Sequence, residues 1–231
     1  MSVIDQIIQR AELTPGHIAI QDKDRAVSFF RFQQDIINAA SNLKLQQVQA
    51  NDNVILHANN GYAFICSYFA VHFLAARCVV VDPKAEASSL VFIREKTQPR
   101  CELISFEPLL EPCSELSTYS HQASAELIAD IIFTSGTTGE PKGVALTHQQ
   151  VLDATKHITQ QVGNDEHDRE LLLMPLCHSF ALGRMRSALL AGTRLVIGYP
   201  LNRLKQVFKA LEAHQITGFG IVPAAWDFIT L

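Results

Sequence analysis

Apolar residues recur along the chain with two spacings, one typical of amphipathic helices and one typical of buried strands. The chain begins with a capping-box pattern at Ser2 and Asp5, followed by apolar residues at helical spacing. Two short apolar runs, 18–20 and 26–29, then flank a polar turn, which predicts a hairpin. Helical spacing resumes over 32–43.

From residue 54 onward the two patterns alternate. The expected strands are 54–57, 78–81, 102–106, 127–134, 171–174, 193–197 and 217–222, and the expected helices are 61–76, 88–96, 147–161, 180–191 and 201–214. Such alternation is typical of βαβ units, in which helices flank parallel strands. We therefore predict an α/β fold with mainly parallel sheets and flanking helices.

Residues 107–126 break this alternation with prolines, serines and little periodicity, which indicates a surface connection. A subdomain division would fall either there or near the acidic turn at 163–170. The most apolar segment, 62–76, is interrupted by Ser67 and His72. It is also shorter than the ~18 apolar residues that a membrane span needs, so we expect a buried helix and no membrane span.

Composition narrows the class of protein further. The 231 residues are 48% hydrophobic and 18% charged, which suits a globular protein with a sizeable core. Nineteen Lys and Arg against 23 Asp and Glu give a net charge of −4, so nucleic acid is not an expected partner and any phosphate site must be local. The five cysteines show no C-x-x-C pair, and the N-terminus lacks a secretory signal pattern. Both observations favour a cytoplasmic protein with reduced thiols.

One segment carries candidate chemistry. Residues 134–143, TSGTTGEPKG, directly follow an expected strand and combine hydroxyls, glycines and a lysine. Glycines let backbone N–H groups approach an anion, hydroxyls add donors, and Lys142 supplies positive charge, which together predict a polyphosphate site. An ordinary turn would need only a glycine or two. The Walker pattern fails because Pro141 stands where its second glycine belongs, and the dinucleotide pattern G-x-G-x-x-G fails because Thr138 stands where a glycine belongs.

The segment IIFTSGTTGEPKGV, residues 131–144, resembles the signature loop of the AMP-forming acyl- and aryl-CoA synthetases, peptide-synthetase adenylation domains and luciferases. Downstream, MPLCHSFALG (174–183) is similar to the family's acyl-pocket segment, and GFGIVPAAWDFI (218–229) is similar to its "VP" segment. Upstream, LAARCVVVDPKA (74–85) is similar to a further family segment, although Arg77 replaces the usual glycine and Val81 the usual proline. The resemblance extends over nearly the whole chain, in the family's order.

The resemblance implies that ATP and a small-molecule carboxylic acid react to an acyl-adenylate, whose acyl group passes to a thiol such as coenzyme A. Mg²⁺ would accompany the ATP or AMP, and the Thr134 hydroxyl is a candidate ligand for it. The loop residues implied to hold the phosphates are Thr134, Ser135, Gly136, Thr137, Thr138, Gly139 and Lys142. Such a loop would act by electrostatic positioning and not by covalent catalysis.

The resemblance also implies an acyl pocket at His178, Phe180 and Gly183. His178 would orient the substrate carboxylate, or it is a partly buried histidine of the fold; Phe180 is a pocket wall or part of the core. Arg184 and Arg186 lie on different helix faces, and we expect them to be solvated or to contact a partner.

The family's later motifs, Y-G-x-T-E, T-G-D and the lysine of a small C-terminal domain, do not occur in this sequence. The resemblance therefore implies the N-terminal portion of an AMP-binding domain over residues 1–231. Two hypotheses follow. The chain is the N-terminal part of an acyl-CoA synthetase or adenylation enzyme, either as a piece of a longer chain or as one half that another chain completes. Alternatively, it is a catalytically inactive module that binds a nucleotide, an acyl group or a partner. An uncovered apolar edge would also promote self-association.

Overall fold

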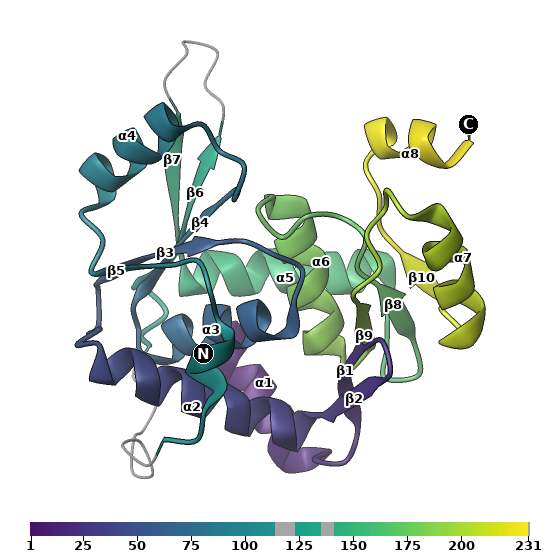
Figure 1. The fold of residues 1–231 in the computed structure, drawn as a ribbon. Helices are drawn as coiled ribbons and strands as arrows, with labels where there is room; N and C mark the ends of the chain where they lie inside the picture. Colours follow the sequence, from purple (N-terminus) through teal and green to yellow (C-terminus); the bar gives the residue numbers. More distant parts are fainter. Residues whose placement is uncertain (114–122, 135–140, 231) are drawn as a thin grey trace.

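The protein contains two five-stranded sheets with helices between and around them (Figure 1). The structure, a computed structural model, describes residues 1–113, 123–134 and 141–230, with side chains as far as Trp226. The first sheet has the order β10 (Gly218–Phe219), β8 (Arg169–Leu171), β9 (Arg194–Ile197), β1 (Ile18–Asp22) and β2 (Arg25–Ser28). The second has the order β5 (Cys101–Leu103), β3 (Asn53–His57), β4 (Arg77–Val81), β6 (Ile128–Thr134) and β7 (Lys142–Thr147).

Both sheets are mainly parallel, as the alternating pattern predicts. Antiparallel pairs are β1 with β2 and β6 with β7, while the strand pairs in the interior of each sheet are parallel. The helices are α1 (Val3–Leu13), α2 (Phe29–Leu45), α3 (Tyr62–Phe73), α4 (Ala87–Thr97), α5 (His148–Val162), α6 (Ser179–Ala191), α7 (Leu204–Ala213) and α8 (Pro223–Thr230), with a 3-10 turn, η1, at Glu107–Leu110. The predicted α/β class is confirmed.

Helix α3 is the centre of the larger core. Every one of its residues is buried, which explains why its sequence is apolar all round and shows no polar face. It packs against α2, and Phe32 of α2 meets Phe69 of α3 edge to face with 5.9 Å between ring centroids. Among the residues that the structure describes, no helix combines the length and apolar character needed to cross a bilayer.

Strand β7 corrects the prediction for the segment after the loop. The pattern predicts strand, loop and helix, whereas the structure places a second strand before α5 and pairs it with β6. Most residues of β7 are exposed because it lies at the sheet edge, so the apolar spacing that marks an inner strand is missing. Strands β6 and β7 therefore form an antiparallel hairpin.

Other boundaries shift by a few residues. Strand β8 ends at Leu171 instead of residue 174, and β10 covers two residues instead of 217–222. The N-terminal hairpin β1–β2 belongs to the same sheet as β8–β10, so this sheet contains strands from early and late parts of the sequence. A division near 107–126 or 163–170 stays a prediction, and residues 114–122 lie outside the described part.

Helices α5 and α6 join the two sheets. Helix α5 contacts β6 and β7 of the second sheet, α6 contacts β9 of the first, and the two helices pack against each other (Figure 1). Helix α5 begins with a capping box formed by Thr147 and Gln150 and ends at Gly163, whose φ of 73° suits a glycine. The candidate site is built around this helix pair.

Candidate functional site

The predicted site residues lie after the carboxyl ends of two parallel strands, where α/β proteins usually bind ligands. Strand β6 ends at Thr134, the first residue of the predicted phosphate loop. Strand β8 ends at Leu171 and leads through residues 172–178 into α6, which carries the predicted pocket residues.

Thr134 and Lys142 face each other at the two ends of the loop. They are register partners in the β6–β7 hairpin, and the Thr134 hydroxyl donates to the carbonyl oxygen of Lys142 at 3.5 Å. Both residues are exposed. Ser135, Gly136, Thr137, Thr138 and Gly139 lie outside the described residues. The hairpin thus offers one hydroxyl and one cation, which fits a phosphate group with its Mg²⁺.

The segment before α6 is held by Asn60, a residue that no sequence pattern marks. Its Nδ2 donates to the carbonyl oxygen of Met174, and its Oδ1 accepts from the backbone N–H of Leu176, both at 2.9 Å. Asn60 follows β3 of the second sheet, so it ties the end of that sheet to a segment that follows β8 of the first. The two bonds flank Pro175 and set the path of the chain towards His178.

The three predicted pocket residues have different surroundings. His178 is exposed at the N-cap position of α6. Phe180 is 40% exposed and lines a cavity of about 550 Å³ between α5, α6 and the segment around β10. Gly183 is buried where α6 approaches α5, and a Cβ there would lie 2.9 Å from Cδ1 of Ile158. Their roles towards a substrate stay predictions.

The cavity beside Phe180 is mainly apolar but contains one cation. Its volume suits a small organic ligand. Its lining residues are His157, Ile158, Gln161, Val162, Asn164, Phe180, Arg184, Thr217, Gly218, Phe219 and Gly220. The Arg184 side chain is only 12% exposed, and its Nε donates to Oε1 of Glu170 at 2.8 Å. The expectation that Arg184 is solvated is wrong for its Nε, which pairs with an acidic residue of β8, while a partner contact stays a prediction.

Asp130 on β6 gathers three side chains in the core. It accepts from the Tyr68 hydroxyl at 2.9 Å and from Nη1 of Arg186 at 2.7 Å, and Nε2 of His72 lies 3.0 Å away. Burial by itself would raise the pKa of Asp130, but His72, Arg186 and Tyr68 lower it to about 2. Since the ionised carboxylate only accepts, Nε2 of His72 carries the proton.

The sequence predicts a solvated position or a partner contact for Arg186, but its side chain is 5% exposed and pairs with Asp130. This pair links α6, which carries the pocket residues, to β6, which leads into the phosphate loop. The donor atoms of His72, Cys78 and Asp130 also lie within 4.8 Å of one another, as in a metal site. Burial raises the pKa of the Cys78 thiol well above its usual value, however, and Arg186 supplies the positive charge. The cluster is a structural network.

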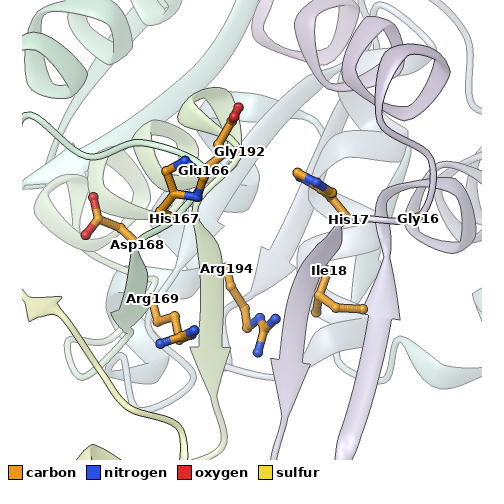
Figure 2. Close-up of a pocket in the computed structure, with 9 residues that line it drawn as sticks. All are labelled: Gly16, His17, Ile18, Glu166, His167, Asp168, Arg169, Gly192 and Arg194. Carbon is orange, nitrogen blue, oxygen red and sulfur yellow. The ribbon is translucent and has the colours of Figure 1, made fainter.

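A second cavity, of about 380 Å³, lies at the opposite end of the first sheet (Figure 2). Ile18, Arg169 and Arg194, which line it, are the first residues of β1, β8 and β9, so it sits at the amino ends of these strands. Figure 2 shows the side chains of both arginines pointing away from His17 and His167. Both arginines also line a further cavity of about 380 Å³ together with Lys23. The two arginines are at the wrong end of a parallel sheet for the predicted chemistry.

The comparisons with known proteins agree with this geometry. The family model "AMP-binding enzyme" matches residues 7–231. A 2-succinylbenzoate–CoA ligase of Bacillus cytotoxicus is 26% identical over 228 residues, which are 94% of this chain and 47% of that protein. The corresponding ligase of Bacillus cereus is 25% identical over the same share of both chains. The chain thus spans about half the length of the curated relatives it matches.

Solved structures share the fold. The o-succinylbenzoate CoA synthetase (MenE) of Bacillus subtilis, in complex with the acyl-adenylate intermediate OSB-AMP, has a TM-score of 0.88 at 21% identity, covering 98% of this chain and 63% of that one. The N-terminal domain of FACL13 of Mycobacterium tuberculosis has a TM-score of 0.88 at 20% identity, covering 99% and 64%. Because the family model covers nearly all of the sequence, the chain belongs to the AMP-binding enzyme family.

Proposed function

We propose that this chain is the N-terminal part of a ligase that activates a carboxylic acid with ATP and passes the acyl group to coenzyme A. The observation that carries the proposal is the phosphate-loop hairpin: the family match covers 7–231, and Thr134 faces Lys142 at the mouth of the loop. The relatives are named as ligases of 2-succinylbenzoate, which makes an aromatic acid the first substrate to test.

Each site residue that the structure describes has a proposed role in this reaction. ATP with Mg²⁺ supplies the activated phosphorus and the leaving pyrophosphate. Lys142 offsets the negative charge of the phosphates, and the Thr134 hydroxyl is the candidate Mg²⁺ ligand. His178 at the N-cap of α6 orients the carboxylate of the acid, while Phe180 forms a wall beside its acyl part. The rate increases because the site holds the carboxylate next to the phosphates, whereas the two anions repel each other in solution.

Lys142→Ala tests the phosphate loop by calorimetry with ATP or pyrophosphate. Removing a charged contact to phosphate is expected to weaken binding by about tenfold or more. Lys156→Ala is the matched control because Lys156 is an exposed lysine of α5 outside the loop. Equal affinity for wild type and Lys142→Ala would contradict the proposal and favour the inactive binding module.

We further propose that another protein surface covers the end of the first sheet. Strand β10 is an edge strand, and an aromatic residue is exposed on it and on each of the helices α7 and α8 that precede and follow it in the chain: Phe219 by 39%, Phe208 by 53% and Trp226 by 52%. A complementing C-terminal chain would cover them, and self-association is the alternative. Sedimentation with and without such a chain, together with pyrophosphate release, distinguishes the two. The buried thiols of Cys66 and Cys78, whose pKa values burial raises, suit the cytoplasm.

A further inference from the structure

Arg184 is held in a way that leaves most of its hydrogen-bonding groups unused. Nε donates to Oε1 of Glu170, while the other carboxylate oxygen, Oε2, accepts from Nδ2 of Asn164 at 2.7 Å. Arginine and carboxylate commonly pair through two parallel bonds, which would engage a terminal nitrogen as well. Here Asn164 takes the second oxygen. Within the described part of the chain, Nη1 and Nη2 of Arg184 make no hydrogen bond.

These terminal nitrogens are not fully buried, and they belong to a residue that lines the cavity. Arg184 lines it, and neither Nη1 nor Nη2 is among the fully buried polar atoms that lack a partner. A guanidinium has five N–H donors, so one bond to Glu170 leaves four for a ligand. Glu170 itself is 1% exposed and already bonded at both oxygens, so it holds the arginine without facing the ligand.

The walls around Arg184 restrict the shape of what binds there. Phe180 stands one helical turn before Arg184 on the same face of α6, and Phe219 of β10 lies on the cavity as well. Gly220 leaves room for both α6 side chains, because a Cβ there would lie 3.1 Å from Phe180 and 3.2 Å from Nε of Arg184. The cavity therefore suits an aromatic or short aliphatic body with an anionic end.

Resting on the proposed function, we infer that Arg184 determines specificity by binding a second carboxylate on the acyl part of the substrate. Arg184 lies six residues after His178, which is about 9 Å along a helix with a rise of about 1.5 Å per residue. An acid whose reactive carboxylate meets His178 would thus place a distal carboxylate near Arg184 if a compact body separates the two. The substrate class is a dicarboxylic acid with an aryl or short acyl body, and a monoacid lacks the contact.

The test measures binding of free acids to this chain by ligand-observed NMR. The probes are 2-succinylbenzoate and two monoacids that each lack one of its carboxylates, 2-butanoylbenzoate and 4-oxo-4-phenylbutanoate. Wild type should prefer the diacid by about tenfold or more. In Arg184→Gln the diacid should bind no better than the better monoacid. Lys156→Gln, which removes an exposed cation of α5, should keep the preference.

Two further variants separate recognition from support of the fold. Arg184→Lys keeps a cation and should retain part of the preference. Glu170→Gln removes the negative charge that offsets the charge of Arg184 and should strengthen diacid binding, whereas a purely structural pair predicts weaker binding of all three acids.

The outcomes also separate this inference from the proposed function. Equal binding of all three acids by wild type, or an unchanged preference in Arg184→Gln, would overturn the role of Arg184 and leave acid activation standing. If none of the acids binds, both the role of Arg184 and the acid-binding part of the proposed function fail. Phosphate-loop binding is then still judged separately by the calorimetry of Lys142→Ala.

Discussion

Helix α6 carries two arginines, two residues apart, that each pair with a carboxylate but serve different purposes. Arg186 and Asp130 have side chains that are 5% and 0% exposed, and Tyr68 and His72 also bond the carboxylate. Arg184 and Glu170 are 12% and 1% exposed, and Arg184 lines a cavity. An arginine–carboxylate pair is therefore a structural link on one face of the helix and part of a candidate recognition site on the other.

The difference lies in what completes each pair. Removing a partner from a buried ion pair leaves an uncompensated charge, and the penalty grows as water is excluded. Asp130 is enclosed by α3, α6 and the second sheet, so nothing can replace a lost partner. Arg184 borders a cavity, in which water or a ligand can replace a lost partner. Substitutions of the two carboxylates and a change of pH test this contrast, and a substitution of Gly183 tests the packing of α6 beside the same cavity.

The largest effect is expected from Asp130→Asn. The change leaves Arg186 buried beside a neutral amide, so the free energy of unfolding should fall by about 3–5 kcal/mol. Glu170→Gln should cost clearly less, about 1–2 kcal/mol, because the charge of Arg184 stays in contact with the cavity. Urea denaturation of both variants measures the difference. Equal losses would show that the two pairs are equivalent.

Acid should affect the two carboxylates in opposite directions. The pKa of Asp130 is about 2 in the folded protein and near 3.8 when unfolded, so its ionisation stabilises the fold above about pH 4. That contribution, on the order of 2 kcal/mol, should disappear as pH falls from 4 to 2. Burial raises the pKa of Glu170, so protonating it relieves a cost instead. The free energy of unfolding should fall less between pH 4 and 2 in Asp130→Asn than in wild type. An equal fall in both proteins would contradict the stabilising role of the Asp130 carboxylate.

The smallest effect concerns the approach of α5 to α6. Gly183→Ala would place a Cβ 2.9 Å from Cδ1 of Ile158, the flexible end of a side chain that lines the cavity. Displacing it should cost about 1–2 kcal/mol in thermal or chemical denaturation. Ile158→Val removes that methyl group, so the cost of Gly183→Ala should be smaller in the Ile158→Val background. Strict additivity of the two changes would argue against direct contact.

The order of the elements was predictable because helical and strand spacing repeat clearly over residues 54–97. The capping box at Ser2 and Asp5 and the start of α5 at Thr147 were also readable, since caps use few residue types. Strand β7 was missed because an exposed edge strand lacks the apolar spacing of a buried one. The composition of the phosphate loop identifies it in the sequence, but the residues from other parts of the chain that support the site cannot be identified in this way.

Asn60 illustrates that limit, because an asparagine after a strand is usual in a turn and gives no hint of a contact more than a hundred residues away.

The amino-acid sequence by itself determined the α/β class, the membership suggested by residues 131–144 and the hydroxyl-rich loop with Lys142, because each of these depends on local spacing and residue type. Tertiary structure decided which charges are structural and which face a cavity. Arg184 and Arg186 look alike in sequence, and a helix rotates them to opposite faces. Their partners, Glu170 and Asp130, come from different sheets, so only the packing of α6 between those sheets assigns each arginine its role.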